Sequence, residues 1–385
     1  MGIKGSGISG VADLAKKMGY KVSGCDLETG GHDVKHLKNI DLLVATPAVF
    51  YQSAKHPELV EGQKRGIVIT WQEFLGKYLA KGKKMICVAG THGKSTTTAM
   101  IGKLLEDAGF DPLVILGANY KDWGGGARFG KGDYFVTEAD EFYDNFLHYR
   151  PEICIVNNIE FDHPDYFKSE KQMLDSYKKF IGNLVGKKIL IIQKDSLNKK
   201  FKLKILGEHN QKNANMAYVV GKTLGIKEEV IIKSLESFEG IGRRMELILN
   251  EKGIRIYDDY AHHPTAIKAT LSALRDRYPK NCVWAIVEPH GFVRTHALLP
   301  LYKNVFKDAD RVIIGPIFKA RDKKTFGMSP NLIAKISGCP NAKGVTSFNQ
   351  IKDILKKEIR SGDIILVMGA GRSNLWAREI CNLKI

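Results

Sequence analysis

The stretch VAGTHGKSTTTAM, from Val88 to Met100, decides the fold class. It resembles the phosphate-binding loop G-x-x-x-x-G-K-[ST], although Val88 stands where the first glycine of that pattern belongs. The apolar segment KKMICVAG precedes it and has the composition of a buried strand. After it, apolar residues recur at the spacing of one helix face: Ile101, Leu104, Leu105 and Ala108. A glycine-rich loop between a strand and a helix predicts a phosphate site in an α/β fold.

The side chains of this loop predict a nucleotide held with magnesium. Glycine lets the chain curl so that backbone amides from Gly90 to Lys94 surround phosphate oxygens. The Lys94 ammonium adds positive charge, and the Ser95 hydroxyl is placed to ligate Mg²⁺. We therefore expect the nucleotide to contact the whole run: Gly90, Thr91, His92, Gly93, Lys94, Ser95 and Thr96.

Composition is that of a globular protein with more than one domain. The chain has 385 residues, of which 44% are hydrophobic and 26% charged. It has no apolar run of about 18 residues and no signal-peptide layout, so we expect a cytoplasmic protein without a membrane partner. The net charge of +17 is spread along the chain without a nucleic-acid-binding motif, so no nucleic-acid partner is expected. Six scattered cysteines are expected to be reduced core residues.

Strands, helices and glycines divide the chain into three blocks, 1–80, 81–240 and 241–385. The first opens with Gly5-x-Gly7-x-x-Gly10, a helix to about Met18, a strand from Lys21 to Gly24 and then Asp26, which is the order of a dinucleotide-binding βαβ unit. The other two blocks alternate strands with helices, which predicts mainly parallel sheets. Their expected strands are DYFVTEAD, EICIVNNI, KILIIQ, IRIYDDY, VWAIVEP, RVIIGPI and DIILVMG, with a helix from Thr265 to Arg277.

Polar groups follow several of these strands, where an open α/β sheet places its ligands. Glu138 in FVTEADEF can ligate magnesium or simply cap the strand, and His163 in IEFDHPDYF can be a ligand or a structural residue. Asn210 and Asn213 can pair with an adenine edge or cap a helix. The motifs GRRME and YDDYAHHP add further candidate site residues: Arg243, Arg244, Asp258, Asp259, His262 and His263.

The series GTHGKS, EADE, NNIEFDH, GEHN-x-x-N, GRRME, DDYAHHPTA and EPHGFVRT, in this order, resembles the Mur ligase family. The shortened loop G-T-x-G-K-[ST] is that family's own form, which explains Val88. The resemblance implies three domains: an N-terminal Rossmann-like domain for the UDP-sugar, a central P-loop ATPase with a mainly parallel sheet, and a C-terminal Rossmann-like domain for the amino acid. It also implies an ADP-forming ligase of peptidoglycan biosynthesis that joins L-alanine to the lactyl carboxylate of UDP-N-acetylmuramate, with ATP and Mg²⁺.

The same resemblance implies a role for each matching residue. Lys94 would contact the ATP phosphates, Ser95 and Glu138 one magnesium ion, and His163 a second. In the second half of the chain, Asn213 with Asn210 would contact the adenine, Arg244 an ATP phosphate and Asp259 the ribose. His262 would lie at the reacting centre, and Arg294 with His290 would bind the alanine. The UDP-sugar would lie on Gly5, Ser6, Gly7, Ser9 and Asp26.

Two positions depart from the family pattern and leave the substrate open. Lys4 stands where the first loop usually has glycine, and Gly291 stands where members that add alanine have a second arginine. An alternative is therefore the related ligase that joins a whole tripeptide to UDP-N-acetylmuramate in peptidoglycan recycling. Alternatives of other classes are a non-enzymatic nucleotide switch and, from the first glycine loop, a nicotinamide dehydrogenase.

Overall fold

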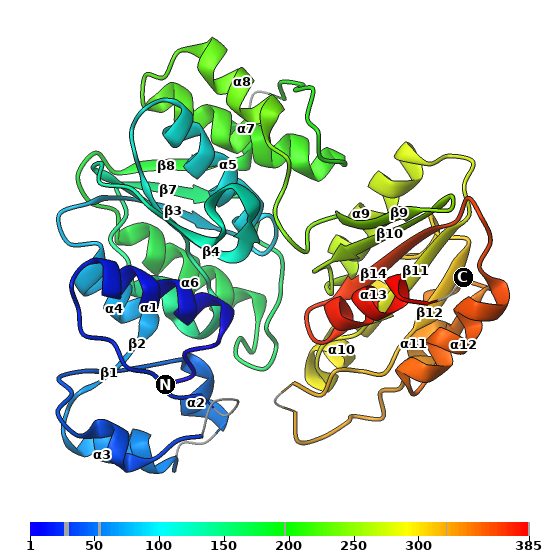
Figure 1. Ribbon diagram of the computed structural model, residues 1–385, viewed down its shortest axis with the longest axis horizontal. Coiled ribbons are helices and arrows are strands. Elements are labelled where there is room, and N and C mark those ends of the chain that lie inside the picture. Colours follow the sequence, from blue (N-terminus) through cyan, green and yellow to red (C-terminus); the bar gives the residue numbers. More distant parts are fainter. Residues whose placement is uncertain (27–30, 53–54, 196–197, 321, 384–385) are drawn as a thin grey trace. The chain divides into compact units, whose positions relative to one another are not determined.

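The computed structural model describes residues 1–26, 31–52, 55–195, 198–320 and 322–383. These form two compact units (Figure 1). Unit 1 comprises Met1–Phe161, Ser169–Phe201 and Asn213–Glu236, and unit 2 comprises Asp162–Lys168, Lys202–Lys212 and Ser237–Ile385. The three predicted domain boundaries stay a prediction, because the two units divide the chain differently.

The N-terminal part of unit 1 contains a small parallel sheet in which β1 (Leu43–Ala45) pairs with β2 (Val68–Thr70). The expected strand from Lys21 to Gly24 was wrong, because this segment lies outside any strand or helix. The expected first helix is confirmed as α1 (Ser6–Lys17). The other short helices here are η1 (Val34–Leu37), α2 (Pro47–Gln52), α3 (Pro57–Lys64), α4 (Trp71–Phe74) and η2 (Leu75–Leu79).

The central sheet of unit 1 has the order β5-β4-β6-β3-β7-β8 within the described residues. Its pairs are parallel except for the β4–β5 hairpin, which the sequence did not predict. The strands are β3 (Lys84–Ala89), β4 (Leu113–Tyr120), β5 (Gly125–Phe129), β6 (Tyr134–Glu138), β7 (Ile153–Val156) and β8 (Ile189–Ile192). Around them lie η3 (Lys121–Trp123), η4 (Phe142–His148), η5 (Gln193–Asp195), α5 (Lys94–Asp107), α6 (Glu170–Gly182), α7 (Glu208–Thr223) and α8 (Glu228–Ser237).

Helix α1 packs on the β4–β5 hairpin, and its glycines allow close contacts. A Cβ at Gly7 would lie 2.9 Å from the Trp71 indole, and one at Gly10 would be 3.8 Å from the Ala127 Cβ. Gly7 therefore allows a close approach of Trp71, whereas a side chain at Gly10 would make only ordinary van der Waals contact. Ile101, Leu104 and Leu105 of α5 are fully buried, as their spacing predicted.

Unit 2 contains one sheet, as far as its described residues go, with the order β13-β12-β11-β14-β10-β9. All pairs are parallel except β9–β10. Its elements are β9 (Glu246–Glu251), β10 (Ile254–Asp259), α9 (Pro264–Arg277), β11 (Val283–Glu288), α10 (Phe292–Leu298), η6 (Leu299–Tyr302), β12 (Arg311–Ile314), α11 (Pro330–Ser337), β13 (Ala342–Gly344), α12 (Phe348–Glu358), β14 (Ile364–Gly369) and α13 (Ser373–Cys381).

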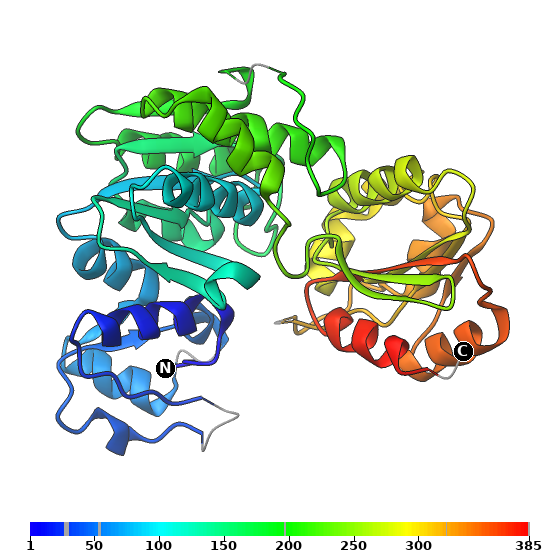
Figure 2. The same ribbon diagram turned by 45° about the horizontal axis from the view of Figure 1, so that its top comes forward.

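Helices cover both faces of this sheet, and alternate residues of each strand feed two cores (Figure 2). Ala285 of β11 packs in the core with α9 and α11, whereas Trp284 and Ile286 pack in the core with α12 and α13. Ile267, Leu271 and Leu274 of α9 are fully buried, as predicted. The α/β class with mainly parallel sheets is thus confirmed.

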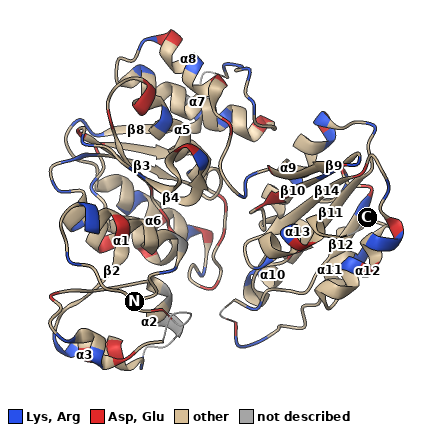
Figure 3. Ribbon diagram, in the orientation of Figure 1, with Lys and Arg blue, Asp and Glu red and all other residues tan. Residues whose placement is uncertain are grey.

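Two predictions from composition can be compared with the structure. All six cysteines are free, and Cys25, Cys87 and Cys154 are buried. Lysines and arginines are distributed over helices and loops of both units (Figure 3). Within the described residues, every helix is too short or too polar to cross a membrane.

Candidate active site

The phosphate loop of unit 1 lies between β3 and α5, at the carboxyl end of the central sheet. The end of the neighbouring strand β7 shapes it: the His92 amide donates to Asn158 Oδ1 at 2.9 Å, and the Thr91 amide donates to the Asn158 carbonyl at 3.1 Å. Thr91 Oγ1 donates to the Glu160 carbonyl at 2.8 Å. The sequence did not assign these roles to Asn158 and Glu160, although both stand in the motif NNIEFDH that follows the strand.

Gly93 is required by its position in this loop. Its φ is +81°, and a Cβ there would lie 2.4 Å from Asn213 Oδ1 and 2.9 Å from Asn157 Nδ2. Two buried asparagine side chains thus press against the backbone where the loop enters α5. A side chain at this position would displace both of them, so the loop keeps its curl only with glycine.

Lys94 reaches across the loop into a group of carboxylates. Its Nζ donates to the Gly90 carbonyl at 2.7 Å and to Glu141 Oε2 at 2.8 Å, and it lies 3.8 Å from Asp140 Oδ1. Although burial opposes its charge, Glu141 and Asp140 hold the pKa of Lys94 above its usual value. The ammonium is therefore charged at neutral pH and fixed at the mouth of the loop.

Ser95 and Glu138, predicted from the sequence as a magnesium pair, lie together. Ser95 Oγ donates to Glu138 Oε2 at 2.8 Å, and the Gly117 amide donates to Glu138 Oε1 at 2.6 Å. They meet because β6 and β3 are neighbours in the sheet, so that Glu138 at the end of β6 faces the start of α5. Thr96 follows in the first turn of α5 and is buried.

The charges of this group fit a divalent cation. One ammonium and three carboxylates, from Lys94, Glu138, Asp140 and Glu141, sum formally to +1 − 3 = −2. A hydroxyl beside a carboxylate supplies the hard oxygen ligands that Mg²⁺ prefers. The residues present therefore fit a magnesium ion at Ser95 and Glu138.

In unit 2, Arg294 of α10 forms an ion pair with Asp162 through Nη2, and both side chains are almost fully buried. Although burial alone would raise it, Arg294 and the nearby His163 hold the pKa of Asp162 well below its usual range. The His163 amide donates to Asp162 Oδ1 at 2.7 Å. His163 and Glu138 belong to different units, so the second magnesium site stays a prediction.

A neutral histidine, His262, lies beside this ion pair. Burial, followed by the charge of Arg294, lowers the pKa of His262 well below its usual value. Because a neutral ring donates from one nitrogen only, Nδ1–H of His262 donates to the Tyr260 carbonyl at 2.8 Å. The His262 ring contacts His290, which stacks on Phe318. His262, His290 and Arg294 are thus brought together within unit 2.

The arginine motif GRRME lies against the end of β10. Arg243 and Arg244 both stack on the Tyr260 ring at 4.9 Å. Both carboxylate oxygens of Asp259 accept backbone hydrogen bonds at 2.7 Å, from Ala261 and Met245. Asp259 therefore orders the turn that carries Arg244, and a ribose contact by its remaining lone pairs stays a prediction.

The two asparagines of α7 belong to different units. Asn210, in the part grouped with unit 2, donates from Nδ2 to the Leu206 carbonyl at 2.6 Å. Asn213, grouped with unit 1, lies against Gly93 as described above. An adenine contact by either residue stays a prediction.

The first glycine loop is ordered by Asp26. The Lys4 amide donates to Asp26 Oδ2 at 3.0 Å, and the Ser9 amide donates to the Gly5 carbonyl at 3.0 Å, which starts α1. Gly7 packs against Trp71. The Ser6 side chain lies outside the described residues, so the UDP-sugar role of Gly5, Ser6, Gly7, Ser9 and Asp26 stays a prediction.

Two positions near the C-terminal motifs were not understood from the sequence. Gly291 has φ +79°, so a second arginine here would be strained, which accounts for the departure from the family pattern. Glu288, at the end of β11, accepts backbone hydrogen bonds from the GAGR turn, including one of 3.0 Å from Ser373. In the sequence, the feature that could have indicated this role of Glu288 is its position at a strand end, opposite a glycine-rich turn.

Family models cover most of the chain. The Mur ligase family catalytic domain matches residues 1–83, the Mur ligase middle domain 88–200, and the Mur ligase glutamate ligase domain 243–371. The UDP-N-acetylmuramate–L-alanine ligase of Clostridium tetani is 34% identical over 96% of this chain and 94% of its own length. The enzyme of the same name from Aquifex aeolicus is 32% identical over 98% of this chain and 96% of its own.

Solved structures show the same fold. The UDP-N-acetylmuramate–alanine ligase of Thermotoga maritima has a TM-score of 0.81 at 22% identity, over 99% of this chain and 97% of that one. A murein peptide ligase from Psychrobacter arcticus has a TM-score of 0.69 at 24% identity, over 100% and 98%. The family models and the relatives at 32–34% identity decide against a nucleotide switch and a nicotinamide dehydrogenase, and they show that the chain belongs to the Mur ligase family.

Proposed function

We propose that this protein joins L-alanine to the lactyl carboxylate of UDP-N-acetylmuramate, with conversion of ATP to ADP and phosphate. The curated relatives carry the name of this reaction and are similar over nearly the whole chain. The observation that carries the proposal is the loop in which Lys94 is held between the Gly90 carbonyl and Glu141, beside the Ser95–Glu138 pair.

ATP is the proposed occupant of the phosphate loop. Amides from Gly90 to Thr96 would donate to its phosphate oxygens at the N-terminus of α5, where the helix dipole favours negative charge. Lys94 would leave the carboxylates and contact the terminal phosphates. Mg²⁺ held by Ser95 and Glu138 would offset phosphate charge, and His163 would hold a second ion.

The remaining site residues divide by the substrate that each would hold. Arg244, Asp259 and Asn210, with Asn213, are proposed to hold the nucleotide, and Arg294 with His290 the alanine. The three domains proposed for these tasks are 1–80 for the UDP-sugar, with Asp26 and the first glycine loop, 81–240 for ATP, and 241–385 for the amino acid.

The chemistry requires the carboxylate to be activated, because a carboxylate at neutral pH does not react usefully with an amine. A lactyl carboxylate oxygen attacks the γ-phosphorus, the bond to the β-phosphate oxygen breaks, and ADP leaves. The neutral alanine nitrogen then attacks the acyl carbon, phosphate departs with its electron pair, and the amine loses a proton. The neutral His262 at the proposed reacting centre has the right state to accept that proton.

Positioning supplies much of the rate. Holding the carboxylate, the γ-phosphate and the amine in line contributes about 7–11 kcal/mol through proximity. The charges of Lys94 and Arg244 stabilise negative charge on the transferring phosphoryl group, so little covalent catalysis by the protein is needed. Since an acyl phosphate hydrolyses in water, the site should exclude water from it, and ATP should then turn over slowly without alanine.

The test is ADP release with ATP, Mg²⁺ and UDP-N-acetylmuramate, supplying L-alanine, glycine, L-serine or the peptidoglycan tripeptide in turn. We expect L-alanine to give the highest kcat/KM, at least about tenfold above the tripeptide, a difference of about 1.4 kcal/mol. A preference for the tripeptide would favour the recycling ligase instead. No ADP release with any acceptor would overturn the proposed reaction.

A further inference from the structure

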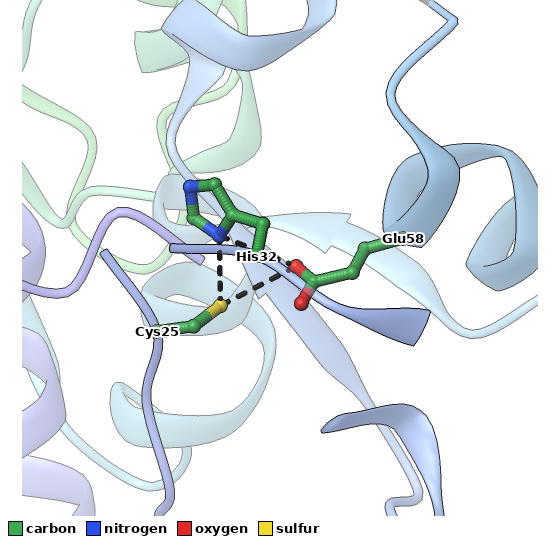
Figure 4. A group of neighbouring side chains, drawn as sticks. All are labelled: Cys25, His32 and Glu58. Atoms are coloured by element: carbon green, nitrogen blue, oxygen red, sulfur yellow. Dashed lines mark hydrogen bonds and ion pairs between the residues drawn. The ribbon is translucent and has the colours of Figure 1, made fainter. Parts of the chain in front are cut away.

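The N-terminal part of unit 1 brings three metal-ligating side chains together, away from the phosphate loop (Figure 4). Cys25 ends the extended segment after α1, His32 lies before η1, and Glu58 lies in the first turn of α3. The His32 Nδ1 to Cys25 Sγ distance is 3.1 Å, Cys25 Sγ to Glu58 Oε2 is 3.3 Å, and His32 Nδ1 to Glu58 Oε2 is 3.4 Å.

These three donor atoms have the spacing of ligands around one zinc ion. Zn²⁺ binds sulfur at about 2.3 Å and imidazole nitrogen or carboxylate oxygen at about 2.0–2.2 Å, so tetrahedral ligands are about 3.3–3.6 Å apart. The nitrogen–oxygen distance of 3.4 Å matches the value expected for that pair, whereas the two distances to sulfur, 3.1 and 3.3 Å, are shorter than the roughly 3.6 Å expected. Cys25 Sγ would therefore move outward by a few tenths of an ångström on binding. A thiolate, an imidazole and a carboxylate together suit zinc better than magnesium or calcium, which take oxygen ligands.

The second oxygen of Glu58 is held in place by other donors. Glu58 Oε1 accepts the Asp33 amide at 2.8 Å and lies 2.7 Å from His36 Nδ1. Oε2 is thereby turned toward Cys25 and His32. Outer contacts of this kind orient the ligands of metal sites.

Burial gives the cluster a reason to hold a cation. The Glu58 side chain is 0% exposed and that of His32 is 9% exposed, and Cys25 belongs to a small apolar core with Met1, Leu37 and Leu43. A buried carboxylate is costly unless positive charge compensates it. When sulfur bonds to the metal, the thiol proton of Cys25 would pass to solvent.

We propose that Cys25, His32 and Glu58 form a zinc site, with water as the fourth ligand. The metal would tie the segment after α1 to α3, and with it Asp26, whose Oδ2 accepts the Lys4 amide of the first glycine loop. The site does not depend on the proposed ligase activity, because no residue of the phosphate loop takes part.

The probe is Co²⁺, followed by Zn²⁺ competition, on the full-length protein freed of metal by chelation. We expect about one equivalent of cobalt with a thiolate-to-cobalt charge-transfer band in the near ultraviolet, abolished by one equivalent of zinc. Cys25→Ser should remove the band and weaken zinc binding more than about 100-fold. Cys339→Ser, a half-buried thiol in unit 2, is the matched control and should keep both.

His32→Gln is the second variant and should lower zinc affinity while leaving a folded protein. Added zinc should raise the unfolding temperature of the wild type and of Cys339→Ser, but not that of Cys25→Ser. Absence of the band in the wild type, or its persistence in Cys25→Ser, would overturn the site. Neither result would bear on the ligase reaction, which ADP release measures separately.

Discussion

Lys94 is the residue on which the nucleotide site depends. It is buried among Glu138, Asp140 and Glu141, and without a nucleotide it compensates their charge. The carboxylates keep the ammonium charged at the loop, where it can exchange a carboxylate partner for a phosphate. The sequence predicted Lys94, Ser95 and Glu138 from their motifs, but not that Lys94 pairs with Glu141.

Lys94→Met should therefore lower the rate of ADP formation by at least about 10²–10³-fold, since it removes a charge that acts on the transferring phosphoryl group. Binding of UDP-N-acetylmuramate, measured by calorimetry, should survive. Lys103→Met is the matched control, because Lys103 lies on the same helix and pairs with Asp107 only, among the contacts of the described residues. Near-normal turnover in Lys94→Met would remove Lys94 from the site.

Arg294 should determine the use of alanine. Loss of a charged hydrogen bond to the amino-acid carboxylate costs about 2–3 kcal/mol, so Arg294→Ala should raise the KM for L-alanine about 30–150-fold. The KM for ATP should change little. Because Asp162 loses its partner too, thermal unfolding is measured in parallel, and Arg294→Lys should restore stability more than alanine affinity. An unchanged KM for alanine in a folded Arg294→Ala would contradict this role.

Asp258 should make stability depend on pH. Burial, with Asp259 adding to it and Arg243 opposing it, raises the pKa of Asp258 from 3.8 to about 6, and its Oδ1 is buried without a hydrogen bond among the described residues. Folding therefore favours the protonated form of Asp258. Above about pH 6 its ionisation lowers the free energy of unfolding by about 3 kcal/mol, and below about pH 4 this loss is absent.

Asp258→Asn removes this cost. Relative to the wild type, its free energy of unfolding should rise by about 3 kcal/mol between pH 4 and pH 7.5. Denaturant unfolding of both proteins at pH 4, 5, 6 and 7.5 measures the difference. Parallel stability curves for the two proteins would show that Asp258 ionises freely in the folded state.

At the scale of elements, the strand–loop–helix unit of β3 and α5 was predicted almost to the residue. Its strand is continuously apolar from Met85 to Ala89, and its helix follows the loop directly and is buried over most of its length. The β4–β5 hairpin and β9 were missed because their residues are mixed and glycine-rich or charged, and only pairing at a sheet edge makes them strands. The strand expected from Lys21 to Gly24 was wrong, because Val22 alone in this segment favours a strand and so short a run is a weak signal.

Gly93→Ala tests the geometry of the loop. Its Cβ would displace Asn213 and Asn157, so ATP affinity should fall at least about tenfold, or about 1.4 kcal/mol. Gly109→Ala is the matched control: its φ is +79°, but no atom lies within 4 Å of the added Cβ. Both variants strain the backbone by about 1–2 kcal/mol, and only the first should weaken ATP binding. Equal ATP affinities would show that the loop tolerates a side chain at Gly93.

At the scale of the whole molecule, motif order carried more information than composition. The charge of +17 and the cysteine count excluded classes of protein but indicated no reaction. Seven short motifs pointed to one family, which the comparisons confirmed. The residues of those motifs lie in two units, with Lys94 in one and Arg294 in the other. Sequence did not predict this division of the motifs between the units, because the division follows from packing contacts between residues far apart in the chain.

The central claim is that a carboxylate of UDP-N-acetylmuramate takes the γ-phosphoryl group of ATP before alanine attacks. It is tested most directly with UDP-N-acetylmuramate carrying ¹⁸O in both oxygens of its lactyl carboxylate, with ATP and L-alanine in unlabelled water. The account predicts that the released phosphate carries one ¹⁸O atom, detected by mass spectrometry, and that the amide carbonyl keeps the other. Released phosphate without ¹⁸O would contradict it.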